Sequence, residues 1–97
     1  MKYLFDFMKV VHARGRFYIK TAGGEAELLY KIDGRIMIMY HTFVPESERG
    51  KNIAGELAKA AFKYAEENGF RVRPACSYIE YYAGKHKELD SIIDTGV

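Results

Sequence analysis

Four short stretches in the first half of the chain have the pattern of β-strands, with partial alternation of polar and apolar residues at 25–32 and mostly apolar residues at 35–44. Glycine occurs in the turn between each pair. Gly15 can supply the positive φ of a tight hairpin, a glycine-containing turn follows at 21–24, and Asp33-Gly34 is the strongest hairpin signal in the sequence. We therefore predict consecutive antiparallel strands at 10–13, 17–20, 25–32 and 35–44.

The fourth of these stretches, RIMIMYHTFV, is apolar at most of its positions. Strict alternation gives it two faces, one with Ile36, Ile38, Tyr40, Thr42 and Val44 and the other with Met37, Met39, His41 and Phe43. A strand that is apolar on both faces is normally covered on both. We therefore expect this strand to be central in the sheet and covered on both sides.

The pattern changes from strand to helix after Pro45. Ile53, Leu57, Ala61 and Tyr64 form a single stripe of a helix at about 52–68, which Gly69 ends as a left-handed cap. The alternation at 70–75 then predicts a short strand, and a strand–helix–strand crossover normally leaves its two strands parallel.

Two short helical segments are predicted after this strand. Ser77 and Glu80 have the spacing of a capping box, so a helix should begin at Ser77. Farther on, Leu89, Ile92 and Ile93 supply enough apolar surface to dock one or two more helical turns.

Length and composition limit the class of protein. The 97 residues leave room for one domain, which we place at 10–97, while 1–9 are an N-terminal extension of undefined structure. A net charge of +2 is too small for a nucleic-acid footprint, and no stretch approaches the roughly 20 apolar residues of a membrane span, so we expect neither partner. The single cysteine suits a reducing compartment, and the cytoplasm is the expected location.

The helix start at 49–54, Arg-Gly-Lys-Asn-Ile-Ala, combines features of an anion site. The first N–H groups of a helix have no partner within it, and the helix dipole places positive charge there. Gly50 allows close approach of an oxygen-rich group such as a pyrophosphate, and Arg49 and Lys51 can add charge. The alternative is a solvated glycine turn that only opens the helix, which the nearby Glu46 and Glu48 favour.

The longer context resembles the acetyl-CoA signature of the GNAT acetyltransferase superfamily. That signature is Gln or Arg, two variable residues, Gly, one variable residue, then Gly or Ala. Arg49 and Ala54 match it, and Asn52 stands at the first glycine position. The segments His41-Thr42-Phe43-Val44-Pro45 and Pro74-Ala75-Cys76 resemble the "HT-x-VP" and "P-x-C" motifs of very short, single-domain GNAT-like proteins, and the likeness extends over about 17–89.

The resemblance implies an α/β (α+β) fold: a mixed, mostly antiparallel sheet, a signature helix across one face and short C-terminal helices. It implies acetyl-CoA as co-substrate, with the pyrophosphate at the turn and the pantetheine arm in the splay between the strands that end near Val44 and Ala75. The implied binding residues are Thr42, Phe43, Val44, Arg49, Gly50, Lys51, Asn52, Ile53 and Ala54. The implied activity is acetyl-CoA-dependent N-acyl transfer to an unknown amine, on a small molecule or a protein.

Three residues are the catalytic candidates. Cys76 can accept the acyl group as a thiolate near a helix N-terminus, or is a small buried residue. His41 can deprotonate Cys76 or the amine, or is a hydrogen-bonded core histidine. The resemblance also implies a tyrosine that protonates the departing thiolate; Tyr78, Tyr81 and Tyr82 all lie in that region, and Tyr82 is the residue assigned to the site.

Two other functional classes stay open at this stage. One is a coenzyme A or acyl-CoA binding module with little or no transferase activity, because the short chain leaves the substrate face open. The other is a small protein-interaction domain that uses its exposed aromatic residues. No metal site is expected, since His12, His41 and His86 lack ligand spacing with one another or with Cys76.

Overall fold

The computed structural model describes residues 9–95. Our predicted N-terminal extension lies outside these residues except for Lys9. The elements are β1 Val11–Ala13, β2 Arg16–Thr21, β3 Gly24–Asp33, β4 Ile36–Phe43, the 3₁₀ turn η2 Glu46–Glu48, α1 Ile53–Glu67, β5 Arg71–Pro74, α2 Ser77–Lys85 and the 3₁₀ helix η3 Lys87–Ile92. The predicted elements are thus present, in the predicted order.

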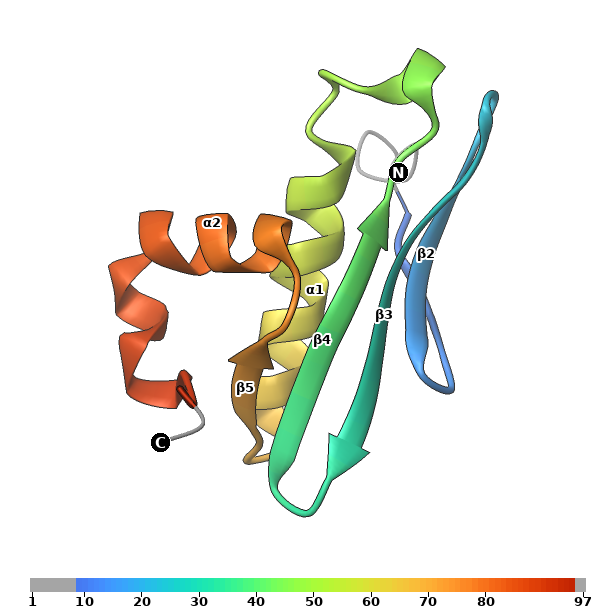
Figure 1. The fold of residues 1–97 in the computed structure, drawn as a ribbon. Coiled ribbons are helices and arrows are strands. Elements are labelled where there is room, and N and C mark those ends of the chain that lie inside the picture. The colour runs from blue at the N-terminus through green and yellow to red at the C-terminus, as the bar shows by residue number, and fades with distance from the viewer. Residues whose placement is uncertain (1–8, 96–97) are drawn as a thin grey trace, which may run out of the picture.

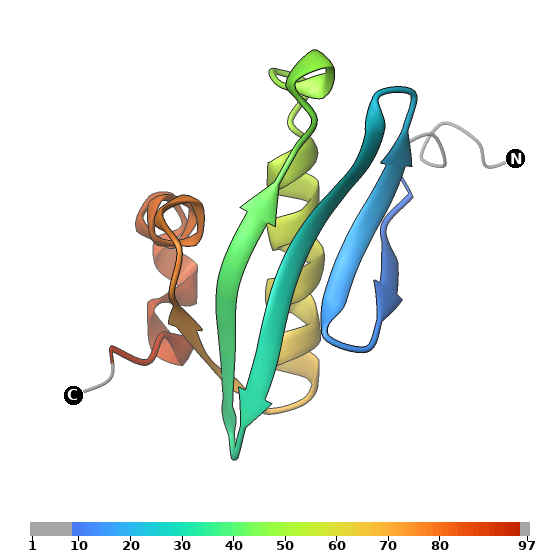
Figure 2. The ribbon, with the colours of Figure 1, turned by 45° about the vertical axis from the view of Figure 1, so that its right-hand side comes forward.

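The strands form one five-stranded sheet in the order β1-β2-β3-β4-β5 (Figures 1 and 2). Strands β1 to β4 pair antiparallel, and β5 pairs parallel to β4 after the α1 crossover. Gly34 in the β3–β4 turn and Gly69 after α1 both adopt a positive φ, as their positions in the sequence predict. The mixed, mostly antiparallel fold class is confirmed.

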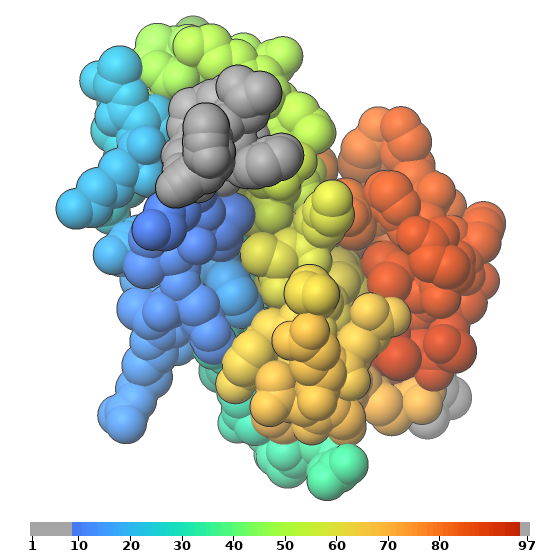
Figure 3. Space-filling model, turned by 180° about the vertical axis from the view of Figure 1, so that it is seen from behind, coloured from blue at the N-terminus to red at the C-terminus, as the bar shows by residue number. Residues whose placement is uncertain are grey.

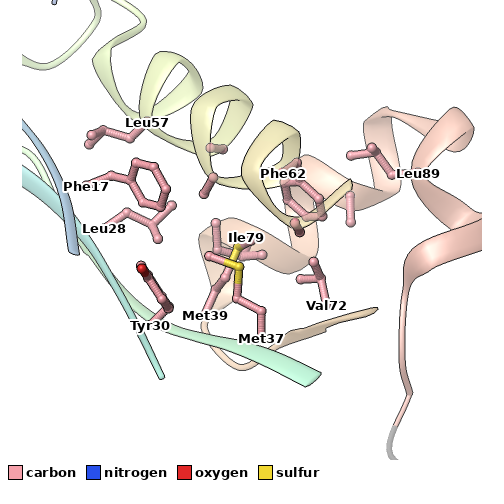
Figure 4. Close-up of a cluster of buried hydrophobic side chains, with 14 of the residues drawn as sticks. Phe17, Leu28, Tyr30, Met37, Met39, Leu57, Phe62, Val72, Ile79 and Leu89 are labelled. Carbon is pink, nitrogen blue, oxygen red and sulfur yellow. The ribbon is translucent and has the colours of Figure 1, made fainter. Parts of the chain in front are cut away.

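The core lies between the sheet and one layer of helices. The apolar stripe of α1 packs on Phe17, Leu28 and Met39, and α2 adds Ile79 (Figure 4). Seen from behind, α1 lies between the β1–β2 hairpin and the segment formed by α2 and η3 (Figure 3). Phe62 of α1 stacks on Tyr82 of α2 with ring centroids 5.6 Å apart, so both helices cover the same face of the sheet.

The prediction that β4 is covered on both faces is wrong. Met37 and Met39 are fully buried under the helices, but Tyr40 and Phe43 keep 44% and 45% of their surface exposed. None of the elements described within residues 9–95 covers the opposite side of the sheet. We call this side the open face.

Strict alternation along β4 is also wrong, because the strand contains a β-bulge. Leu29 of β3 pairs with His41 but Tyr30 pairs with Met39, which leaves Tyr40 as an extra residue. A bulge reverses which residues point to which face. Thr42 therefore faces the helices together with Met37 and Met39, whereas His41 shares the open face with its neighbour Leu29.

The start of α2 differs in one detail from its prediction. The helix begins at Ser77, but Cys76 is the N-cap residue, and no side chain among those that the structure describes caps the helix. Cys76 has extended backbone angles, and its carbonyl accepts the first helical hydrogen bond, from the Glu80 N–H at 3.1 Å. The predicted capping box between Ser77 and Glu80 is therefore not formed.

Candidate functional site

The splay between β4 and β5 begins where their pairing stops. The pairing runs from Ile36 with Arg71 to Met39 with Pro74, and the Ala75 N–H donates to the Met39 carbonyl at 2.9 Å. Strand β4 then continues to Phe43 while the chain after β5 turns into α2, as both ribbon views show. The upper part of β4 therefore has a free edge on this side, as the resemblance implies.

Two cavities open at this splay. The smaller, about 270 Å³, is lined by Thr42, Phe43, Val44, Arg49, Ala54 and Tyr78. The larger, about 420 Å³, extends along the turn before α1 and is lined by Val44, Glu48, Arg49, Gly50, Asn52, Ile53, Ala54, Gly55, Tyr78 and Tyr81. Eight of the nine predicted coenzyme-binding residues line one or both cavities.

The turn before α1 lines part of the larger cavity. Gly50 has φ +86° and Asn52 has φ +63°, so the chain makes two left-handed steps before the helix begins at Ile53. No side chain in the described part of the chain caps this helix end. Its first N–H groups and the positive end of the helix dipole therefore remain available to an anion.

Asn52 adopts the left-handed conformation for which glycine is the usual residue. Its side chain lies over Gly55, where an added methyl group would clash with the Asn52 carboxamide oxygen. Sequence reasoning missed Gly55 as part of this site. A glycine in the first turn of a helix is less favourable than an alanine, so its presence at position 55 is the sequence feature that could have indicated a functional or packing role.

The two cations of the turn lie in different places. The Nε of Arg49 donates to the Val44 carbonyl at 3.0 Å, which holds the guanidinium beside both cavities. Lys51 instead pairs at 3.0 Å with Glu48, whose buried carboxylate also accepts the Gly23 N–H at 3.1 Å. The structure thus places Arg49 at the site and ties Lys51 to the β2–β3 turn.

Cys76 and His41 are not brought together. The Cys76 sulfur is half-buried on the helix side, 3.8 Å from the Thr42 hydroxyl. The bulge places His41 on the open face, where its Nε2 is 4.0 Å from Glu27 Oε2. A role for His41 as the base that activates Cys76 therefore has no geometric support.

Tyr78 lines both cavities, whereas Tyr81 lines only the larger one. Burial, followed by the neighbouring Tyr82 and Tyr81, raises the pKa of Tyr78, which keeps its hydroxyl protonated at neutral pH. Tyr82, the predicted residue, stacks on Phe62 and on His86 and lines another cavity between α1 and η3. Tyr82 lies four residues after Tyr78, which is about 6 Å along the axis of α2. This distance separates Tyr82 from the splay.

Within residues 9–95, no three His, Cys, Asp or Glu side chains are grouped so that they could hold one metal ion. Among the helices described here, none combines the length and the apolar character needed to cross a bilayer.

The fold and the splay define the class of protein. Residues 16–92 match the family described as GCN5-related N-acetyl-transferase, and the chain belongs to this family. Protein NATD1 of Mus musculus is 39% identical over 80 residues, which cover 77% of this chain and 73% of the mouse protein. The Homo sapiens protein of the same name is also 39% identical over 80 residues, covering 77% of this chain and 71% of its own length.

A solved structure has the same fold. An NMR structure of a GCN5-like protein from Staphylococcus aureus superposes with a TM-score of 0.71 over 92% of this chain and 90% of the other, at 20% sequence identity.

Proposed function

We propose that this protein transfers an acetyl group from acetyl-CoA to an amine. The observation that carries the proposal is the larger cavity, where an uncapped helix start with two left-handed residues adjoins the free edge of β4. Backbone donors at a helix N-terminus suit a pyrophosphate, and a free strand edge suits the amide groups of a pantetheine arm. In this proposal the turn at Gly50–Ala54 binds the pyrophosphate and Thr42–Val44 bind the arm.

Direct attack of the amine on the thioester is the mechanism we favour. Among residues 9–95, the Cys76 sulfur lies within hydrogen-bonding distance of the Thr42 hydroxyl, 3.8 Å away, and of no basic side chain. Tyr78 lies at the splay, and its raised pKa keeps the hydroxyl protonated, so this hydroxyl is available to donate a proton to the departing thiolate. Cys76 is then a packing residue at the start of α2.

The experiment is an amide NMR titration of the protein with acetyl-CoA. We expect the shifted amides to lie at Thr42–Val44 and at Gly50–Gly55. Gly50→Ala should weaken binding by about tenfold, because its methyl group enters the space that a phosphate needs to reach the backbone.

Gly34→Ala is the matched control for this variant. Gly34 also has a positive φ, +63°, and neither glycine has a heavy atom within 4 Å of an added Cβ. Both variants therefore carry a similar backbone strain, about 1–2 kcal/mol, but only Gly50 lines the cavity. Equal affinities of the two variants would remove the turn from the coenzyme site.

A second arm distinguishes the chemical alternatives. Incubation with acetyl-CoA and an amine, followed by acid quench and intact-mass measurement, should give acetylated amine and no acetyl group on the protein. An adduct that maps to Cys76 would contradict direct attack. Binding without acetylation of any amine would favour the coenzyme A binding module over the transferase.

A further inference from the structure

The open face carries a polar group that the coenzyme cavities do not include. His41 of β4 and Glu27 of β3 lie on this face, 4.0 Å apart between Nε2 and Oε2. Neither residue lines the two cavities at the splay. The imidazole therefore lies beside the free edge of β4 but on the side of the sheet opposite to Tyr78.

Glu27 is held in place through one of its two oxygens. Arg16 of β2 donates to Oε1 from both Nε and Nη2, at 3.3 and 3.0 Å, and its Nη2 also donates to Glu25 at 2.9 Å. Among residues 9–95, no side chain or backbone group donates a hydrogen bond to Oε2. A carboxylate fixed on one oxygen and free on the other can accept a proton donor that arrives at the open face.

Apolar side chains lie on the same face, together with Lys31, whose Nζ is 5.9 Å from the centre of the Tyr40 ring. Leu29 and Ile38 are half-buried, while Tyr40 and Phe43 are each exposed over almost half of their surface. A lysine side chain has the complementary composition, because its four methylene groups pack on apolar surface while the ammonium group seeks a carboxylate. The site lies on the exposed surface of the sheet, outside the two cavities at the splay, which suits an extended peptide better than a small free metabolite.

We propose that the acceptor is a lysine side chain within an extended peptide segment, which binds across the open face with its amine at His41 and Glu27. This inference rests on the proposed function. His41 acts as the base, and Glu27 is a positioning residue that orients the imidazole and balances its positive charge. Arg16 fixes Glu27 in turn.

The proton and bond changes balance as follows. The lysine arrives as an ammonium ion and gives one proton to His41, which releases it to solvent. The amine nitrogen attacks the thioester carbonyl carbon, and the carbon–sulfur bond breaks as the amide forms. Tyr78 protonates the thiolate, and the proton that the nitrogen loses on becoming an amide restores Tyr78 through solvent.

The first test uses the capped peptide acetyl-Gly-Lys-Gly-amide and the same peptide with norleucine in place of lysine. In an amide NMR titration, the lysine peptide should shift residues of β2, β3 and β4 around Arg16, Glu27 and His41, and the norleucine peptide should shift them less. Shifts confined to the helix-covered side, or equal shifts with both peptides, would overturn the inference.

The second test compares Glu27→Gln with Glu25→Gln. Glu25 also bonds to Arg16 but lies two residues, about 7 Å, farther along β3 from Glu27. Glu27→Gln should lower kcat/KM for the lysine peptide by at least about tenfold, with an unchanged Kd for acetyl-CoA and an unchanged urea midpoint. Glu25→Gln should stay within about twofold.

A double variant separates positioning from a merely structural role. If Glu27 acts through His41, then Glu27→Gln should have no further effect in a His41→Asn background. Independent, additive losses, or equal losses for the Glu27 and Glu25 variants, would refute the role of Glu27. Acetyl-CoA shifts at Gly50–Gly55 without any peptide shifts on the open face would refute only this inference, whereas an absence of acetyl-CoA shifts would refute the proposed function itself.

Discussion

The two faces of the sheet are formed by the same strands but differ in burial. The covered face consists of residues such as Leu28 and Met39, which the helices bury completely. The open face consists of their immediate neighbours in sequence, Leu29 and Tyr40, together with His41. Burial under α1 and α2 supplies stability, and the lack of a second helical layer leaves polar groups on the other side accessible.

The bulge at Tyr40 connects these two roles. Without it, His41 would face the helices with Met37 and Met39, and Thr42 would face solvent. With it, Thr42 approaches Cys76 on the covered side, and His41 meets Glu27 on the open side. The extra residue thus places the candidate base, His41, and the candidate acid, Tyr78, on opposite sides of the free edge of β4.

The largest expected effect is a difference in stability between a variant on the covered face and a variant on the open face. Leu28→Ala removes a fully buried side chain and should lower the free energy of unfolding by about 2–5 kcal/mol. Leu29→Ala, one residue later on the half-exposed side, should cost less than about 1.5 kcal/mol. Urea denaturation of both variants measures the difference. Equal losses would show that something covers the open face in solution and would break the comparison.

The sequence predicts most of the covered side and little of the open one. Gly34, Gly69 and the stripe of α1 are local signals, since a turn glycine or a helical period depends only on nearby residues. The bulge depends on how β4 aligns with β3, whose pairs on either side of it are 9 and 12 residues apart in the sequence. A single extra residue reverses every later assignment of faces. Strict alternation therefore failed from Tyr40 onward.

The candidate site shows the same limit of prediction from sequence: local motifs can be recognised, but contacts between distant segments cannot. The turn at 50–54 follows from a local motif, and all of its residues except Lys51 line the larger cavity. The pairing of Lys51 with Glu48, and of Glu48 with Gly23, joins segments 25 residues apart, so composition alone could not assign it. The choice between Tyr78 and Tyr82 likewise depends on how α2 docks on Phe62.

The second prediction compares two tyrosines on the covered side of the sheet. If catalysis takes place only at the splay between β4 and β5, the loss of each hydroxyl should affect kcat differently. Tyr78→Phe and Tyr82→Phe remove the same hydroxyl one helical turn apart. Burial is the main cause that raises the pKa of both phenols, with Tyr82 and Tyr81 adding for Tyr78, and Glu88 and Glu56 for Tyr82. Tyr78→Phe should lower kcat by about 100-fold with little change in acetyl-CoA affinity, because a general acid contributes about that much.

Tyr82→Phe should keep kcat within about twofold of wild type, since its ring stacks remain. Steady-state release of the free thiol measures both variants. The reverse result, with loss of kcat in Tyr82→Phe alone, would restore Tyr82 as the acid and place the reaction outside the splay.

The smallest effect concerns His12, which pairs with Phe17 at the edge of the sheet and packs on the covered side. Its ring stacks on Phe17 at 4.1 Å, meets Tyr64 edge-on at 4.5 Å and hydrogen-bonds through Nε2 to the Tyr30 hydroxyl. Burial lowers the pKa of His12 from its ordinary value of 6.5. At pH below 6.5 the unfolded chain therefore binds a proton at this residue more readily than the folded protein does.

The contribution of His12 to stability is thus fully present above pH 6.5 and is lost as the pH falls below that value toward the lowered pKa. His12→Gln removes the titration but keeps an amide oxygen that can accept from Tyr30. The urea midpoint of the wild type should fall more between pH 7.5 and 5.5 than that of the variant, while other titrating groups contribute equally to both. If the urea midpoints of the wild type and of His12→Gln fall by the same amount, protonation of His12 does not oppose folding. The packing of His12 on the covered side would then not favour its neutral form.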